Sequence, residues 1–366
     1  MYYTELIKII EGGMNKDLKK VLSYSKHLAK KLREDGDEKL ADKIIKTIEG
    51  SVGTPVFKDE LFDSPMDSDT RLSIADVLLP QDIKLDISIP KSTQEPIDNF
   101  ITLVNSKNKI ESKGLEMNLS LLLYGPPGCG KTTLAKHIAK ELEIPIVIAR
   151  LDSLISSLLG NTAKNIRKLF DYAKRKPCVL FLDEFDAIAK ARDDIHETGE
   201  LKRVINSLLQ NIDCFMKTGV LIAATNHEKL LDSAVWRRFE KIFYVNKPSV
   251  EEIKKLVVAH FKKVNPKLEI GNKKFDLLVS YLKDLSHSEI VKIMNSAYYN
   301  SIIQNKEFEY LEIFSEYYKY KHNNRFNLVE MIRFLNESCV TQKQIANNLD
   351  VSIRQVRNAL NVEQDG

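Results

Sequence analysis

The chain has 366 residues and a formal net charge of +4, with 43% hydrophobic and 29% charged residues. At about 150 residues per domain, this length favours two or three domains. The near balance of 55 basic and 51 acidic side chains excludes a protein that binds polyanions along its whole length. The composition also excludes a disordered, collagen-like or disulfide-stapled chain.

The four cysteines have no paired spacing and form no Cys/His cluster, which argues against zinc and fits a reducing compartment. The first residues do not read as a signal peptide. The longest apolar runs are strand-sized, far below the roughly 20 residues that a membrane span needs. We therefore expect a cytoplasmic protein that has no membrane partner.

Residues 1–50 are predicted to form a helical N-terminal domain. Gly36 interrupts the helical pattern, and a second helix is predicted from residue 38 to about residue 47. The domain is either a small bundle with solvated faces or an adaptor similar to the three-helix interaction modules that precede some motor ATPases. Residues 51–90, rich in Ser and Asp and punctuated by Gly53, Pro55, Pro65 and Pro80, are predicted to be a linker. Within the N-terminal domain, the helix before Gly36 is indicated by apolar positions at mostly helical steps, namely Leu18, Val21, Leu22, Leu28 and Leu32.

Residues 91–247 alternate short apolar runs with amphipathic helices, after a helical stretch over 92–115. Continuous apolar strands separated by helices predict a parallel sheet covered on both faces, which is an α/β fold. Helical patterns then predict an all-helical lid and extension over 248–320 and a C-terminal segment over 321–366. The predicted strands are 119–125, 144–151, 178–184, 220–226 and 241–245.

The segment Gly125-Pro126-Pro127-Gly128-Cys129-Gly130-Lys131-Thr132 fits the phosphate-binding pattern G-x-x-x-x-G-K-[ST]. It follows a predicted strand and opens a predicted helix, as the mechanism requires, so that backbone N–H groups and the helix N-terminus face an anion. Lys131 is expected to reach the β- and γ-phosphates and Thr132 to ligate Mg²⁺. We expect the whole loop and the following Thr133 to contact the nucleotide.

A second motif, Val179-Leu180-Phe181-Leu182-Asp183-Glu184, places two carboxylates at the end of a buried strand. Open α/β sheets bind their ligands at this edge. Asp183 can hold Mg²⁺, and Glu184 can polarise an attacking water. About 50 residues after a phosphate-binding loop, this motif predicts nucleotide hydrolysis.

These two motifs, GPPGCGKTTLAKHIA at 125–139 and LFLDEFDAIAKAR at 180–192, resemble those of the AAA family of ring ATPases. The resemblance covers about residues 90–304. It implies that Asn226, at the end of a later strand, orients the attacking water. It also implies that Arg237 and Arg238 are arginine fingers, which a neighbouring subunit inserts towards the γ-phosphate.

Two further segments depart from the family pattern. Leu285-Ser286-His287-Ser288-Glu289-Ile290 resembles the lid segment that closes over adenine, but His287 stands where glycine is usual. In the family's substrate-gripping pore loop, Leu158-Leu159-Gly160 replaces the aromatic residue with an aliphatic one. These leucines either grip an extended chain or form a packing pair at a helix start.

Residues 341–360 resemble a helix-turn-helix, with Ser352 as the expected cap of the second helix. That helix is predicted to expose Arg354, Gln355, Arg357 and Asn358, whose side chains suit phosphates and base edges. Asp350 stands where a turn glycine is usual. The alternative is a protein-docking or structural helix pair.

The family resemblance implies an ATP-hydrolysing enzyme with ATP and Mg²⁺ as cofactors, working as a homo-oligomeric ring with a hexamer as the favoured size. The first hypothesis is a remodeller of a protein substrate, with the N-terminal helices recruiting the substrate or a partner enzyme. The alternative is a DNA-associated ATPase switch, such as a regulator, loader or defence component, that uses residues 341–360. No HExxH or GxSxG motif occurs in the sequence, so proteolysis would need a separate partner.

Overall fold

The structure is a computed structural model that describes most of the chain. The chain divides into two compact units, residues 1–65 and 66–366. Each unit is described here by itself. The described residues are 3–14, 24–25, 27–29, 31–33, 35, 37–51, 65, 73–85, 89, 91–151, 154, 159–175, 177–187 and 199–361.

The first unit is helical, with α1 (Tyr3–Met14) and α3 (Glu38–Ser51) as its longest described helices. Leu28, Ala29, Leu32 and Ala41 are buried together and form a small core. The predicted second helix is confirmed. Leu18, Val21 and Leu22 lie outside the described residues.

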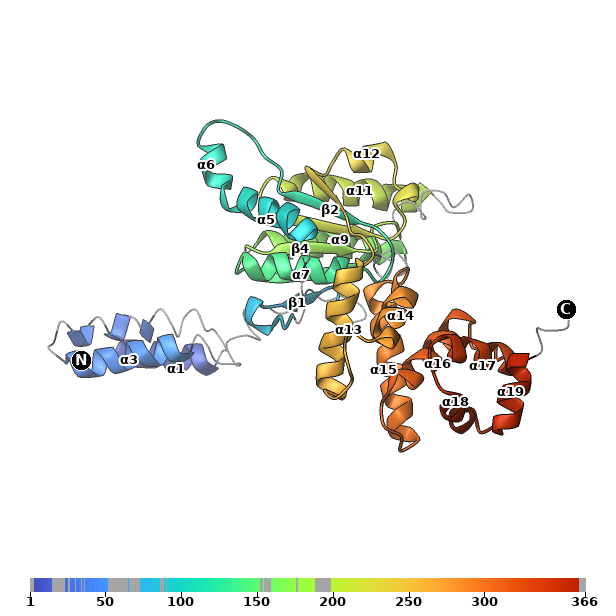
Figure 1. Cartoon of the computed structure of the whole chain (residues 1–366). Coiled ribbons are helices and arrows are strands. Elements are labelled where there is room, and N and C mark those ends of the chain that lie inside the picture. Colours follow the sequence, from blue (N-terminus) through green and yellow to red (C-terminus); the bar gives the residue numbers. More distant parts are fainter. Residues whose placement is uncertain are drawn as a thin grey trace. The chain divides into compact units, whose positions relative to one another are not determined.

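The second unit contains a six-stranded sheet in the order β1-β3-β4-β5-β2-β6 (Figure 1). Five of its strands are parallel to their neighbours, as predicted. The sixth, β1 (Asp76–Leu78), pairs antiparallel with β3 and lies in the predicted linker. It has only three residues, too few to show an alternating pattern. The parallel strands are β2 (Ser120–Tyr124), β3 (Ile146–Arg150), β4 (Val179–Asp183), β5 (Val220–Thr225) and β6 (Lys241–Tyr244).

Helices cover both faces of the sheet. Alternate strand residues point to opposite sides, so each face has apolar side chains that the helices bury. Leu122 faces a cluster built with α9 (Leu159–Lys174) and α11 (Gly199–Met216). Its neighbours Leu121 and Leu123 face a second cluster, built with α5 (Lys91–Asn105) and α7 (Lys131–Glu141). Shorter elements of this part are η1 (Pro80–Asp82), α6 (Lys107–Glu111), η2 (Glu228–Leu230) and α12 (Ser233–Trp236).

Seven helices follow the sheet in the described part of the chain, and their buried side chains form a single cluster. That cluster runs from Ile253 to Ala359 and crosses residue 320, where a boundary is predicted; the division of the chain into five segments stays a prediction. Among the described residues, no helix combines the length and the apolar composition of a membrane span. The seven helices are α13 (Val250–Val264), α14 (Lys273–Leu282), α15 (His287–Ile303), α16 (Tyr310–Lys321), α17 (Leu328–Glu337), α18 (Gln342–Leu349) and α19 (Ile353–Asn361).

Candidate nucleotide-binding site

The glycine-rich loop joins the end of β2 to the start of α7 and leaves no room for side chains at two positions. Gly125 has a φ of +142°, and a Cβ there would lie 2.4 Å from the carbonyl oxygen of Val245. Gly128 has a φ of +74°, and a Cβ there would lie 2.0 Å from Oγ of Ser288. Only glycine tolerates this combination of backbone angle and close approach. The loop is therefore held between the end of β6 and the first turn of α15.

The Lys131 side chain is buried inside the loop that precedes it. Its Nζ donates hydrogen bonds of 2.8 and 2.9 Å to the carbonyl oxygens of Gly125 and Pro126. Burial lowers the pKa of this ammonium group, while Cys129, Asp183 and Asp186 act in the opposite direction. A cation held only by loop carbonyls can exchange them for phosphate oxygens, so the arrangement suits a phosphate ligand.

Thr132 and Asp183, which the sequence predicts as metal ligands, are in direct contact. Oγ1 of Thr132 donates a 2.9 Å hydrogen bond to Oδ2 of Asp183. Within the described ranges, no group of three or more His, Cys, Asp or Glu side chains could hold a metal ion. Magnesium usually takes only one or two carboxylates and completes its shell with water and substrate phosphates. The hydroxyl and carboxylate pair fits that pattern once a nucleotide supplies the remaining oxygens.

Glu184 follows β4 in a backbone conformation that is unusual for a residue with a side chain. Its φ is +54°, a left-handed value that costs of order 1–3 kcal/mol outside glycine. Oε1 of Glu184 lies 3.6 Å from Nη2 of Arg150, at the end of the neighbouring strand β3. The turn thus places Glu184 with Asp183 in one cleft with the glycine-rich loop, at the edge of the sheet where open α/β sheets bind ligands. Sequence reasoning missed Arg150, although its position at a strand end was a usable signal.

Asn226, just after β5, lines one cleft of about 480 Å³ together with Lys131, Thr132, Asp183 and Glu184. The strand end is fixed by a buried pair that sequence reasoning also missed. Oγ1 of Thr225 donates a 3.1 Å hydrogen bond to Oδ1 of Asp186 and accepts one from the backbone N–H of His227. The cleft therefore gathers residues from the glycine-rich loop, β4 and β5.

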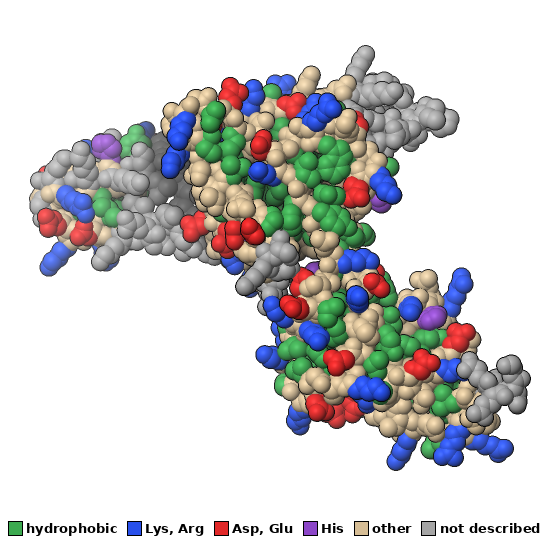
Figure 2. Space-filling view, turned by 45° about the horizontal axis from the view of Figure 1, so that its top comes forward, with side chains coloured by type: hydrophobic (Ala, Val, Ile, Leu, Met, Phe, Trp, Pro, Cys, Tyr) green, Lys and Arg blue, Asp and Glu red, His purple; other side chains and the backbone are tan. Residues whose placement is uncertain are grey.

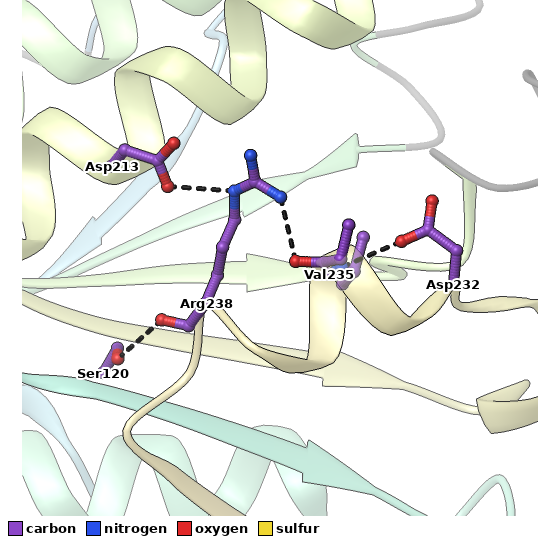
Figure 3. A network of polar contacts seen from close by, with 6 residues as sticks. Ser120, Asp213, Asp232, Val235 and Arg238 are labelled. Carbon is purple, nitrogen blue, oxygen red and sulfur yellow. Dashed lines mark hydrogen bonds and ion pairs between the residues drawn. The ribbon is translucent and has the colours of Figure 1, made fainter.

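The two predicted arginine fingers follow α12, and neither lines the 480 Å³ cleft of its own chain. Nε of Arg238 donates a 2.9 Å hydrogen bond to Asp213, and its Nη1 donates one of 2.9 Å to the carbonyl oxygen of Ala234 (Figure 3). Arg237 is exposed, and in the described part of the chain no hydrogen bond or ion pair holds its side chain. The two neighbours therefore differ in freedom, which their sequence does not reveal.

The first turn of α15 touches the glycine-rich loop directly. The backbone N–H of Ser288 donates to the carbonyl oxygen of Gly128 at 3.1 Å. Ser286 caps the helix, and its backbone N–H donates to Glu289 at 2.6 Å in a reciprocal capping box. The predicted lid segment thus lies against the site through its backbone.

A smaller cleft of about 130 Å³ adjoins the first one, on the side where the resemblance places adenine. His287 lines both clefts, with Nε2 3.9 Å from Oε1 of Glu252 and with its buried Nδ1 unpartnered in the described structure. Burial lowers the pKa of His287, and Glu252 partly opposes this. Cys129 and Thr133 also line the smaller cleft, and burial raises the pKa of the Cys129 thiol. Glu252 was not foreseen from the sequence, since α13 carries no motif.

The remaining predicted positions lie elsewhere or are not described. Leu158 lies outside the described residues; Leu159 and Gly160 begin α9, but the structure does not describe their side chains. A larger cleft of about 620 Å³ lies between α14, α15 and α16 and contains none of the predicted site residues.

The geometry is that of a nucleotide hydrolase with a phosphate-binding loop. Residues 121–247 match the family model described as ATPase family associated with various cellular activities (AAA). An uncharacterized AAA family ATPase of Sinorhizobium fredii is 38% identical over 228 residues, which are 62% of this chain and 68% of that protein. The chain belongs to the AAA family, and it binds and hydrolyses ATP.

A second relative is the proteasome-activating nucleotidase 2 of Haloferax volcanii, 32% identical over 216 residues. The match covers 57% of this chain and half the length of that protein. Among solved structures, the FIGL-1 AAA domain in complex with ADP has a TM-score of 0.57 at 21% identity. The structural match covers 70% of this chain and 89% of the FIGL-1 chain. This likeness confirms the fold, a mostly parallel sheet covered by helices and followed by a helical lid.

Proposed function

We propose that the chain is a subunit of a homo-oligomeric ring, favoured as a hexamer, that uses ATP hydrolysis to remodel a protein substrate. The observation that carries the proposal is the convergence of Lys131, Asp183, Glu184 and Asn226 on one cleft, while Arg237 lies outside it. A complete site then needs an arginine from a second copy. The proteasome-activating relative supports a protein substrate for the proposal.

In this mechanism Lys131 leaves its two loop carbonyls and binds the β- and γ-phosphates. Thr132 and Asp183 would hold Mg²⁺, which neutralises the phosphate charge when it is bound. Glu184 accepts a proton from the attacking water, and the Asn226 amide orients that water. Because Ser288 of the lid contacts Gly128, a change in the glycine-rich loop on ATP binding is passed directly to the lid.

The purine is proposed to lie in the smaller cleft, between Cys129 and Thr133 on one side and His287 and Glu252 on the other. The free thiols Cys129, Cys178, Cys214 and Cys339 fit a reducing compartment, and we place the protein in the cytoplasm. The comparisons lend no support to a DNA-associated switch as the ATPase's function, so protein remodelling stands as the proposal.

The test measures ATPase activity per subunit against protein concentration, with the oligomeric state followed in parallel by mass photometry. A ring predicts activity that rises with assembly, because Arg237 acts on the neighbouring site. A constant rate in a strictly monomeric sample would contradict the ring. The substrate class is tested with the Glu184→Gln variant, which should retain its protein substrate in ATP and release it in ADP. The retained substrate should also stimulate the wild-type ATPase. A retained protein that leaves the rate unchanged would argue against remodelling.

A further inference from the structure

The last two helices in the described part of the chain, α18 and α19, are joined by a short turn. Asp350 ends α18 with a φ of +53°, the left-handed value that closes a short turn. Both helix starts are capped: Thr341 with Gln344 before α18, and Ser352 with Gln355 before α19. Because caps and turn fix the backbone, the angle between α18 and α19 is set before any partner binds.

α17 packs beneath this pair, within the buried cluster that all seven helices share. Met331 and Leu335 of α17 are buried with Ile345 of α18 and with Val356 and Ala359 of α19. Nε of Arg333 also donates a 3.1 Å hydrogen bond to the carbonyl oxygen of Ala359. α19 therefore rests on a narrow apolar stripe, and the rest of its surface faces solvent.

The outer face of α19 is polar and basic. Ile353, Arg354, Arg357 and Asn358 are exposed on it. Nε of Arg357 lies 3.4 Å from Oε1 of Gln342, so the start of α18 lies beside the middle of α19. Gln355 is exposed as predicted, but its Oε1 also accepts two hydrogen bonds from Ser352 in the helix cap. The four exposed side chains that take no part in a helix cap are Ile353, Arg354, Arg357 and Asn358, and Arg357 uses only its Nε in the bond to Gln342.

Within the described residues, the cations at this end of the second unit have no carboxylate partner. Lys343, Arg354 and Arg357 form no ion pair among the described residues, and Asp350, in the turn, is the one acidic residue between 341 and 361. Figure 2 shows lysine and arginine side chains projecting at the lower right, at this end of the second unit. Unpaired cations around a helix suit a polyanion, because each one can release condensed counterions from it.

We propose that α18 and α19 dock on duplex DNA, with α19 in the major groove. That groove is about 12 Å wide and admits one α-helix. Arg354 and Arg357 suit guanine edges or phosphates, Asn358 suits adenine, and exposed Ile353 suits the thymine methyl group. Lys343 would contact the backbone from α18. This goes beyond the proposed function, since it assigns the ring a place of action and leaves its chemistry unchanged.

Duplex DNA fits better than the other anions. An acidic protein would be matched by the three cations and would not need the Asn358 amide or Ile353 among them. Double-stranded RNA has a major groove too deep and narrow for side chains to read. The exposed face of α19 combines arginine, amide and one aliphatic side chain, which is the kind of helix surface that reads base edges.

The test uses the full chain, fluorescently labelled 30-base-pair duplexes of varied sequence, and fluorescence anisotropy at about 50 mM salt, where phosphate contacts are strong. Arg354→Ala/Arg357→Ala should raise Kd at least about ten-fold and reduce the salt slope by about 2 per bound copy. Lys255→Ala/Lys262→Ala removes the same charge from exposed positions of α13 and should leave Kd within about two-fold of wild type.

Three outcomes would overturn the proposal: no binding of duplex DNA by the assembled wild type, equal weakening by both double variants, or tighter binding of a poly-glutamate peptide than of DNA. The last would assign the face to an acidic protein. ATPase rates are measured on the same samples, and both double variants should keep the wild-type rate. Failure of DNA binding with intact ATPase activity is then distinct from failure of the proposed function.

Discussion

The phenol of Tyr320, near the end of α16, donates a 2.5 Å hydrogen bond to Oε1 of Glu289, in the first turn of α15. This bond raises the pKa of Tyr320 to about 12. Burial would raise the pKa of Glu289, but hydrogen bonds from Ser286 and Tyr320 outweigh it and lower that pKa. Because Ser288, beside Glu289, touches Gly128, the Tyr320 bond connects α16 to the glycine-rich loop through one helix turn.

Tyr320→Phe should loosen that turn without leaving a cavity, since it removes one hydroxyl. We expect KM for ATP to rise by about three- to ten-fold, the equivalent of one hydrogen bond of about 1 kcal/mol, with a smaller change in kcat. Steady-state kinetics measure both constants. Tyr299→Phe, on an exposed tyrosine of the same lid, is the matched control and should change neither. An unchanged KM in the Tyr320 variant would mean that the turn holds its position without the bond.

Glu184→Gln should abolish turnover while keeping nucleotide. The amide keeps the side-chain volume, so Asp183, Thr132 and the glycine-rich loop remain in place. The amide cannot, however, accept a proton from water. We expect kcat to fall by about 10²–10⁴-fold. A phosphate-release assay gives the rate, and anisotropy of a fluorescent ATP analogue gives Kd. Lys131→Ala should show the opposite split, with weaker binding as its main effect. A wild-type rate in the Glu184 variant would remove that residue from its assigned role.

Arg237 and Arg238 should respond differently to substitution. Arg237→Ala should reduce ATPase activity by about 10³-fold, as expected for a finger at a neighbouring site, with little effect on unfolding. Arg238→Ala removes bonds to Asp213 and Ala234, so it should destabilise the fold by about 0.5–2 kcal/mol. Thermal unfolding and ATPase assays separate the two effects. Mixing Arg237→Ala protein with Lys131→Ala protein should restore some activity at mixed interfaces; no recovery would place Arg237 outside the site.

His287 should make the lid sensitive to mild acid. Burial lowers its folded pKa below the usual 6.5, with Glu252 opposing, and burial likewise lowers the pKa of His260. Below pH 6.5 the unfolded chain binds the proton first, so the free energy of unfolding falls as pH drops through the folded pKa. His287→Asn should make this decline shallower in denaturant titrations between about pH 5 and 7.5. His227→Asn, at an exposed position, is the control. Parallel declines in the His287 variant and wild type would refute the assignment.

The sequence alone determined the α/β architecture, the five parallel strands and the residues that meet at one cleft. These depend on local patterns: apolar runs of strand length, and a glycine-rich loop whose spacing to Lys131 and Thr132 is fixed within eight residues. Parallel strands bring their carboxyl ends to one edge. The meeting of Asp183, Glu184 and Asn226 near the loop follows from that rule without any knowledge of packing.

Only the tertiary structure decided the contacts between distant elements. Arg237 and Arg238 are neighbours in sequence, yet only Arg238 is held, because α11 presents Asp213 to it. Tyr320 and Glu289, 31 residues apart, meet because α15 and α16 pack in one core. Glu252 approaches His287 for the same kind of reason, since α13 lies against the start of α15. Such pairs depend on how helices pack, and a hydrophobic period tells which face of a helix is buried but not which residue of another helix it meets.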